Sequence, residues 1–104
     1  MKFIQVQFTI DNKSSAEEIA RTLIDEKMAA CVQIVGPVTS IYRWQNKIEQ
    51  SGEFLCLIKT EKSLYSRLEQ RIKTLHHYKI PEIISIDIVD IESNYSKWIH
   101  DSLI

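Results

Sequence analysis

Apolar and polar residues alternate over the first ten positions of the chain. The apolar positions fall on one side of an extended segment: Ile4, Val6, Phe8 and Ile10. Because successive strand side chains point to opposite faces, the pattern predicts a first strand with one buried face. The other face carries Gln5 and Gln7 in place of charged residues. Uncharged polar side chains favour a covered, hydrogen-bonded surface over a freely solvated one.

The next segment changes to the spacing of a helix. Its apolar residues recur every three or four positions: Ala16, Ile19, Ala20, Leu23 and Ile24. This spacing predicts an amphipathic helix that continues to about Met28. Ser14 and Ser15 are candidate N-caps, because Glu17 and Glu18 follow them three residues later as in a capping box.

A second helix is predicted after residue 62. Its apolar stripe consists of Leu64, Leu68, Ile72 and Leu75, and Ser63 is positioned to cap it. The helix must end before Ile80, because Pro81 disfavours helical geometry in the residue that precedes it.

The last quarter of the chain predicts one more strand and one short helix. A period of two is formed by Ile84, Ile86 and Ile88 with Ser85 and Asp87 between them, as expected for a strand. Ser93 is a candidate cap for a terminal helix that carries Tyr95, Trp98 and Ile99.

The middle of the chain predicts an unusually long β-hairpin. Residues 31–44 are rich in β-branched and aromatic types, and residues 54–58 are apolar at consecutive positions, as in a strand covered on both faces. Gln45-Asn46 is the expected tip, because Asn tolerates the positive φ of a tight turn. Fourteen extended residues span roughly 46 Å, whereas a compact chain of this length is roughly 33 Å across. Either Gly36-Pro37 bends the hairpin back, or its end packs on another subunit.

Taken in order, the elements predict strand, helix, strand, strand, helix, strand and a terminal helix. This is the ferredoxin-like βαββαβ arrangement of the α+β class, in a single domain over residues 1–104. Both long helices should cover one face of a four-stranded antiparallel sheet. The other face lacks cover within the chain, so we expect another subunit to cover it.

Composition narrows the classes of partner. The 104 residues include 13 basic and 14 acidic ones, for a formal charge of −1, so no strong field favours nucleic acid. No apolar run approaches the length of a membrane helix, and the first residues lack the apolar region of a signal peptide. We therefore expect a cytoplasmic protein that binds neither nucleic acid nor membrane. Two cysteines are too few for a disulfide framework, so both should be free thiols.

Several ordered motifs resemble those of the CutA family of divalent-cation tolerance proteins. They are Ala29-Ala30-Cys31, the run 38–44 with Lys47-Ile48 after it, Ile58-Lys59-Thr60 and the run 76–83. The chain departs from the family pattern at Gly36-Pro37, Asn46, His77 and Lys79. The resemblance implies a ferredoxin-like subunit, a homotrimer and a link to copper, but no settled reaction. We accordingly expect a non-enzymatic homotrimer that acts in tolerance of copper and other divalent cations.

Metal binding is the chemistry that the residues offer most directly. We predict that Cys31, His76 and Glu82 bind copper, because the family is linked to copper and thiolate and imidazole suit this metal. Their spacing matches no strong metal signature, and a free cysteine in an apolar strand is usually a core residue. Glu82 can equally accept structural hydrogen bonds. The three need not meet within one subunit, so the site is expected at a subunit boundary, with Cu(II) preferred over Zn(II).

Other functions have weaker support in the sequence. A trimeric signalling or small-ligand-binding protein similar to the PII class shares this topology, but no phosphate-binding glycine loop is present. RNA-binding RRM domains share the element order, yet residues 54–58 lack their aromatic and basic signature. No serine or cysteine lies in a recognisable nucleophile motif, so hydrolase activity has no support. Tyr42 and Trp44 are expected to pack at an interface.

Overall fold

The computed structural model describes residues 1–104 and has the predicted α+β architecture. Its strands are β1 (Phe3–Ile10), β2 (Cys31–Trp44), β3 (Lys47–Glu61) and β4 (Ile83–Asp87). Its helices are α1 (Lys13–Asp25), the short 3₁₀ turn η1 (Lys62–Leu64), α2 (Tyr65–Leu75) and α3 (Ser93–Asp101). The strands form one antiparallel sheet in the order β2-β3-β1-β4. This order confirms the ferredoxin-like arrangement.

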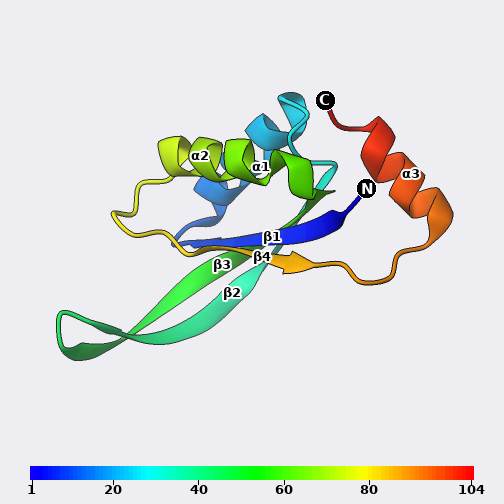
Figure 1. Ribbon diagram of the computed structural model, residues 1–104. Coiled ribbons are helices and arrows are strands. Elements are labelled where there is room, and N and C mark those ends of the chain that lie inside the picture. The colour runs from blue at the N-terminus through cyan, green and yellow to red at the C-terminus, as the bar shows by residue number, and fades with distance from the viewer.

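The hydrophobic core lies between the sheet and helices α1 and α2, which cover the same face (Figure 1). The alternating residues of β1 face these helices and are fully buried: Ile4, Val6, Phe8 and Ile10. The predicted helix stripes supply Ile19 and Leu23 from α1 and Leu68 and Ile72 from α2. The strand β1 and the helices α1 and α2 therefore bury their apolar faces in a single core, as predicted.

The start and end of α1 differ from the prediction. Asn12 is the N-cap, and its side-chain oxygen accepts a hydrogen bond from the Ser15 N–H at 2.8 Å. Ser14 and Ser15 are already helical, so neither can serve as the cap. The helix also ends three residues before Met28, because Lys27 takes a left-handed φ of 59° and reverses the chain.

The other two predicted caps were also wrong. Ser63 lies inside the turn η1, and the N-cap position of α2 is Leu64, whose side chain makes no capping bond. In α3 the cap is Glu92 in place of Ser93. The carboxylate of Glu92 accepts two backbone N–H groups of the first turn, and these bonds lower its pKa. A carboxylate there also faces the positive end of the helix dipole.

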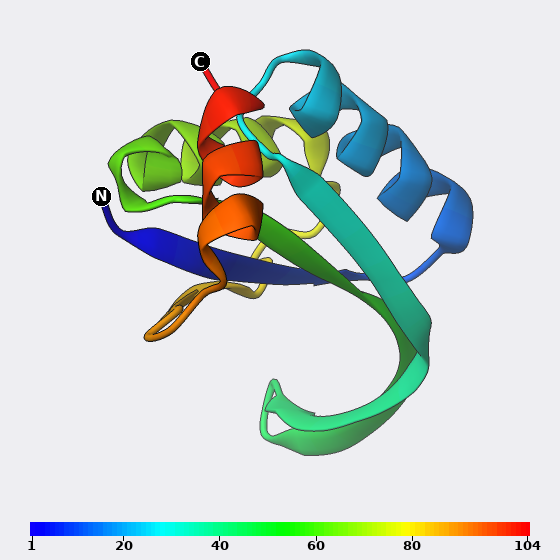
Figure 2. The same cartoon turned by 90° about the vertical axis from the view of Figure 1, so that its right-hand side faces the viewer.

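The β2–β3 hairpin extends beyond the sheet and curls beneath it (Figure 2). Its tip is Gln45-Asn46, as predicted, with φ of 50° and 66°. The pairing of β2 with β3 shifts register between Val35 and Val38, so Gly36-Pro37 marks the bend. A Cβ added to Gly36 would lie 2.8 Å from the Phe54 ring and 3.0 Å from a backbone oxygen, so glycine permits this close approach. The hairpin is thus bent back, which was the first of the two predicted alternatives.

Helices α1 and α2 leave the second face of the sheet free, and α3 packs against one end of it, where His100 pairs with Glu61 (Figure 2). The register places Ile86 opposite Gln5 and Ile84 opposite Gln7, so all four belong to this open face. The two isoleucines are 44% and 46% exposed, while their neighbour Ile83 packs on the core. The Gln5 amide donates to the Gln7 side-chain oxygen at 3.3 Å. This face is therefore covered by α3 at one end, contrary to the expectation that the chain offers it no cover, and it stays uncovered at Ile84 and Ile86.

The two cysteines are free and lie on opposite faces of the sheet. Cys56 faces the core opposite Ile34 and is fully buried. Burial raises the pKa of its thiol to about 11. Cys31 opens β2 opposite Lys59, on the open face, and is partly buried. None of the helices has the length and hydrophobicity needed to cross a membrane.

Candidate functional site

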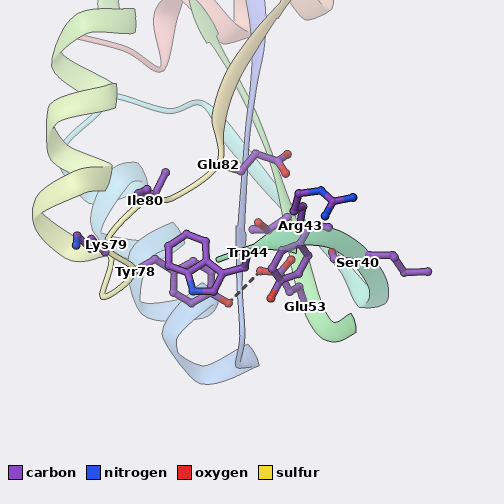
Figure 3. Close-up of a pocket in the computed structure, with 11 residues that line it drawn as sticks. Ser40, Arg43, Trp44, Glu53, Tyr78, Lys79, Ile80 and Glu82 are labelled. Atoms are coloured by element: carbon purple, nitrogen blue, oxygen red, sulfur yellow. Dashed lines mark hydrogen bonds between the residues drawn. The ribbon is translucent and has the colours of Figure 1, made fainter. Parts of the chain in front are cut away.

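A cleft of about 750 Å³ lies between the curled hairpin and the loop that follows α2 (Figure 3). Strand β1 contributes Thr9 to its lining, and the hairpin and the loop supply all of the other residues. These are Ser40, Ile41, Tyr42, Arg43, Trp44, Glu53, Tyr78, Lys79, Ile80 and Glu82. The volume is in the range of small-molecule sites. The bend at Gly36-Pro37 creates the cleft, because it turns the hairpin end toward the loop.

A glutamate and a tyrosine form its most buried polar pair. Glu53 is only 7% exposed, and the Tyr78 hydroxyl donates to its Oε2 at 2.9 Å. Burial raises the pKa of Tyr78 well above its ordinary value, and the hydrogen bond to the Glu53 carboxylate raises it further. The phenol therefore keeps its proton at neutral pH and acts as a donor.

Charged and aromatic side chains surround this pair. Arg43, Lys79 and Glu82 are exposed, and none of them forms an ion pair within the chain. Trp44 is 41% exposed and lines the cleft together with Tyr78. The cleft thus combines a buried carboxylate, an aromatic wall and a charged mouth.

His76, one of the predicted copper ligands, lies directly beneath the loop. It is 8% exposed, and its ring meets the edge of Phe8 with centroids 6.0 Å apart. Its Nε2 is 2.7 Å from the Thr9 carbonyl oxygen, and its Nδ1 is 3.1 Å from the Tyr78 backbone nitrogen. A carbonyl only accepts and an N–H only donates, so Nε2 carries the proton and Nδ1 holds the lone pair. Both ring nitrogens are therefore engaged in holding the loop on β1.

The other two predicted ligands lie in different places. Glu82 lines the cleft, close to the Thr9 end of β1. Cys31 lies across the sheet in the same row as Gln5, four residues back along β1 and two strands away. Four residues along the strand and two strand spacings across the sheet put Cys31 roughly 16 Å from Thr9.

Within one chain, no three His, Cys, Asp or Glu side chains cluster in a way that could hold a metal ion. Cys31, His76 and Glu82 accordingly do not fit a copper ion inside a single subunit. The predicted site lies at a subunit boundary, which a single chain does not test, and it stays a prediction. The remaining histidines are on the surface, where His77 pairs with Asp11 and His100 with Glu61.

Little in the sequence pointed to the Glu53–Tyr78 pair. The two residues are 25 positions apart and meet only because the hairpin bends. One local signal was present: Glu53 directly precedes the apolar run 54–58, where a buried carboxylate requires a partner. Tyr42, which was expected at an interface, lines the cleft, and its hydroxyl lies 3.2 Å from the Ser51 Oγ across the hairpin.

Comparison with known proteins agrees with the motifs. Residues 4–102 match the family described as CutA1 divalent ion tolerance protein. The divalent-cation tolerance protein CutA of Thermus thermophilus is 38% identical over 97 residues, which are 93% of this chain and 94% of that protein. The chloroplastic CutA of Arabidopsis thaliana is 34% identical over 99 residues, and these cover 95% of this chain but 54% of that protein. The chain therefore spans about half the length of this plant relative.

The fold is also similar to that of solved structures. The crystal structure of CutA1 from Oryza sativa superimposes with a TM-score of 0.97 at 36% identity, covering 100% of this chain and 95% of that one. The similarity thus includes the hairpin and the terminal helix as well as the core. Sequence motifs, family match and structural likeness all extend over nearly the whole chain, which therefore belongs to the CutA1 divalent ion tolerance family.

Proposed function

We propose that this chain forms a non-enzymatic homotrimer that acts in tolerance of divalent cations and binds copper. The observation that carries the proposal is the apolar surface that one chain leaves uncovered. Its members are 41–73% exposed and lie on the open sheet face and the hairpin: Val35, Ile41, Tyr42, Trp44, Ile48, Ile84 and Ile86. Exposed apolar side chains in such number often mark sites of association.

The shape of the subunit supports a closed ring. The hairpin extends the molecule to 45 Å along its longest axis, against 26 and 22 Å along the others. An arm that reaches to one side makes a head-to-tail contact with the next copy, and such contacts close into cyclic oligomers. Closure also protects the outer strands β2 and β4, whose unpaired edges would otherwise invite aggregation. The number of subunits in the ring, three, is what the resemblance to the CutA family implies.

Copper is proposed to bind where subunits meet. Cys31 lies on the sheet face opposite α1 and α2, near Tyr95 of α3, and is only partly buried. Glu82 is exposed and lines the cleft. His76 can bind the copper ion only after one of its two ring nitrogens releases its hydrogen bond. A thiolate, an imidazole and a carboxylate make a mixed set, which suits Cu(II) over Zn(II) with moderate affinity.

We assign no catalytic step and propose a cytoplasmic location. The polar pair in the cleft is a tyrosine that keeps its proton and a carboxylate that accepts a hydrogen bond from it, so neither is an activated nucleophile. Fractionation of the source cells tests the location.

The metal role is tested by copper titration of the assembled protein. Cys31→Ala, His76→Ala and Glu82→Ala are compared with wild type and with Glu49→Ala, which alters an exposed glutamate of β3 outside the cleft. Each variant is first shown to be folded and to have the same mass. Weaker binding in the first three variants, with Glu49→Ala unchanged, supports the site. Wild-type affinity in all three means that these residues are structural and that the metal role falls to His77 or His100.

The assembly is tested at Trp44. If the next subunit covers its exposed part, Trp44→Ala should cost about 3–5 kcal/mol, as for large aromatic residues in cores. Because folding and association are then coupled, the melting temperature of the wild type should rise with protein concentration. Lys47→Ala, at an exposed position three residues away, serves as the control. A Trp44→Ala protein that melts like the control would show that Trp44 faces solvent.

A further inference from the structure

The carboxylate of Glu53 lacks a cation. Its side chain is 93% buried, yet no Lys, Arg or His nitrogen lies within 4 Å of it. Its only side-chain partner is the Tyr78 hydroxyl, which donates to Oε2. Buried charges in proteins are normally paired, because removal from water is costly without a counter-charge. The pair in the cleft is therefore electrostatically incomplete.

The second oxygen of Glu53 is available to a ligand. No fully buried side-chain nitrogen or oxygen in the chain lacks a hydrogen-bond partner. Because Oε1 has no partner, it retains exposure, and the space beside it is the cleft that Glu53 lines. Arg43 and Lys79 also line this cleft without reaching the carboxylate, and in Figure 3 the Lys79 amino group points away from it. No side chain of the chain therefore supplies a cation to this carboxylate.

The surroundings of Glu53 suit an organic cation better than a metal ion. A divalent ion held by oxygen needs about six ligands, whereas no group of three potential ligands is assembled here. The Tyr78 hydroxyl contacts the carboxylate, and the side chains of Trp44 and the exposed Ile80 line the same cleft (Figure 3). Aromatic faces attract ammonium groups, and apolar walls bind the attached hydrocarbon.

We propose that the cleft binds a small organic amine, whose ammonium group donates to Glu53 Oε1 and whose hydrocarbon part packs against Trp44 and Ile80. The Tyr78 hydroxyl holds the carboxylate in place from the other side. The volume of about 750 Å³ accommodates a ligand of this class. The proposed copper ligand Glu82 lines the same cleft, but Glu53 is not among the proposed copper ligands, so the amine proposal does not depend on copper binding.

Calorimetric titration of the full, assembled protein tests the proposal with three probes of similar shape. Phenethylamine carries an ammonium group, 2-phenylethanol is neutral and phenylacetate is an anion. Phenethylamine should bind at least about tenfold more tightly than either of the others, because hydrogen bonds to charged groups are worth about 1.5–3 kcal/mol. Equal binding of the alcohol would overturn the proposal, and so would preferred binding of phenylacetate, which would assign the cleft to Arg43 and Lys79.

Two variants locate the binding. Glu53→Gln keeps the side-chain shape, removes its charge and should weaken phenethylamine binding at least about tenfold. Glu49→Gln, on the same strand but exposed and outside the cleft, should leave it unchanged. Unaltered binding in Glu53→Gln would overturn the proposal.

A second measurement keeps the test decisive if Glu53→Gln does not fold. Phenethylamine should shift the Glu53 side-chain carboxyl carbon resonance of the wild-type protein in ¹³C NMR, and 2-phenylethanol should not. A resonance that is unmoved at saturating amine would contradict the assignment. Copper titration of the Glu53→Gln protein distinguishes the two proposals, because Glu53 is not a proposed copper ligand and copper affinity should equal that of the wild type whether or not amine binding is lost.

Discussion

Replacing His76 by alanine should destabilise the fold far more than replacing its neighbour His77. The imidazole of His76 joins the Thr9 carbonyl to the Tyr78 backbone N–H at 2.7 and 3.1 Å and packs on the edge of Phe8. Alanine leaves both backbone groups without a partner, and a buried unpaired group costs about 1–3 kcal/mol. Water that enters the vacated space offsets part of this cost. A net loss of about 2–4 kcal/mol in the free energy of unfolding is the expected result.

His77→Ala is the matched control. The His77 imidazole lies 3.0 Å from Asp11, and both side chains are 50% exposed. Exposed pairs of this kind contribute about 0–1 kcal/mol. Urea unfolding of both variants and wild type, at one protein concentration because assembly affects stability, gives the comparison.

Equal stability of the two variants would refute the reasoning. It would mean that the hydrogen bonds of His76 contribute nothing and that its ring is free to bind copper. If His76→Ala is destabilised as expected, weaker copper binding by that variant alone does not identify a ligand. Cys31 and Glu82 then carry the metal test.

Three further predictions follow from single contacts. Gly36→Ala should cost about 1–3 kcal/mol in thermal unfolding, since its Cβ would meet backbone, whereas Gly52→Ala has open space and should change little. In a Cys31→Ser variant, Cys56 should resist thiol reagents at pH 8 until the protein unfolds, because burial raises the pKa of its thiol to about 11. Rapid labelling of the native protein would contradict this. Arg71 donates to both oxygens of Glu26 at 2.7 and 2.8 Å and thereby lowers the pKa of that carboxyl. The pair stabilises the fold at pH values above the ordinary glutamate pKa and loses this effect as the pH falls and Glu26 is protonated. The difference in unfolding free energy between wild type and Arg71→Met should therefore shrink in acid. A difference that is constant with pH would argue against the pair.

Periodicity predicted the elements because it reflects which side chains are buried. Strand β1 and helix α2 each turn one unbroken apolar face to the core, and their residues were identified correctly from spacing alone. The turn at Gln45-Asn46 was also predictable, since few residues accept positive φ. The caps were less predictable, because Asn12 and Glu92 compete with nearby serines that have similar capping ability.

The cleft could not be predicted from local sequence patterns. Period two separates the faces of β4, but it does not say which face is buried, and Ile84 and Ile86 turned out to lie on the open one. Glu53 and Tyr78 meet through the curvature of a hairpin, which depends on the close approach of Gly36 to Phe54. Contacts of this kind join distant segments, so no window of the sequence reports them.

The mass of the protein in solution tests the central proposal, assembly through the uncovered sheet face and hairpin, most directly. Light scattering at micromolar concentration should give about three times the 12.2 kDa of one chain. A stable species of 12.2 kDa with the native fold would contradict the account, because the open face and hairpin would then be solvated in the functional protein.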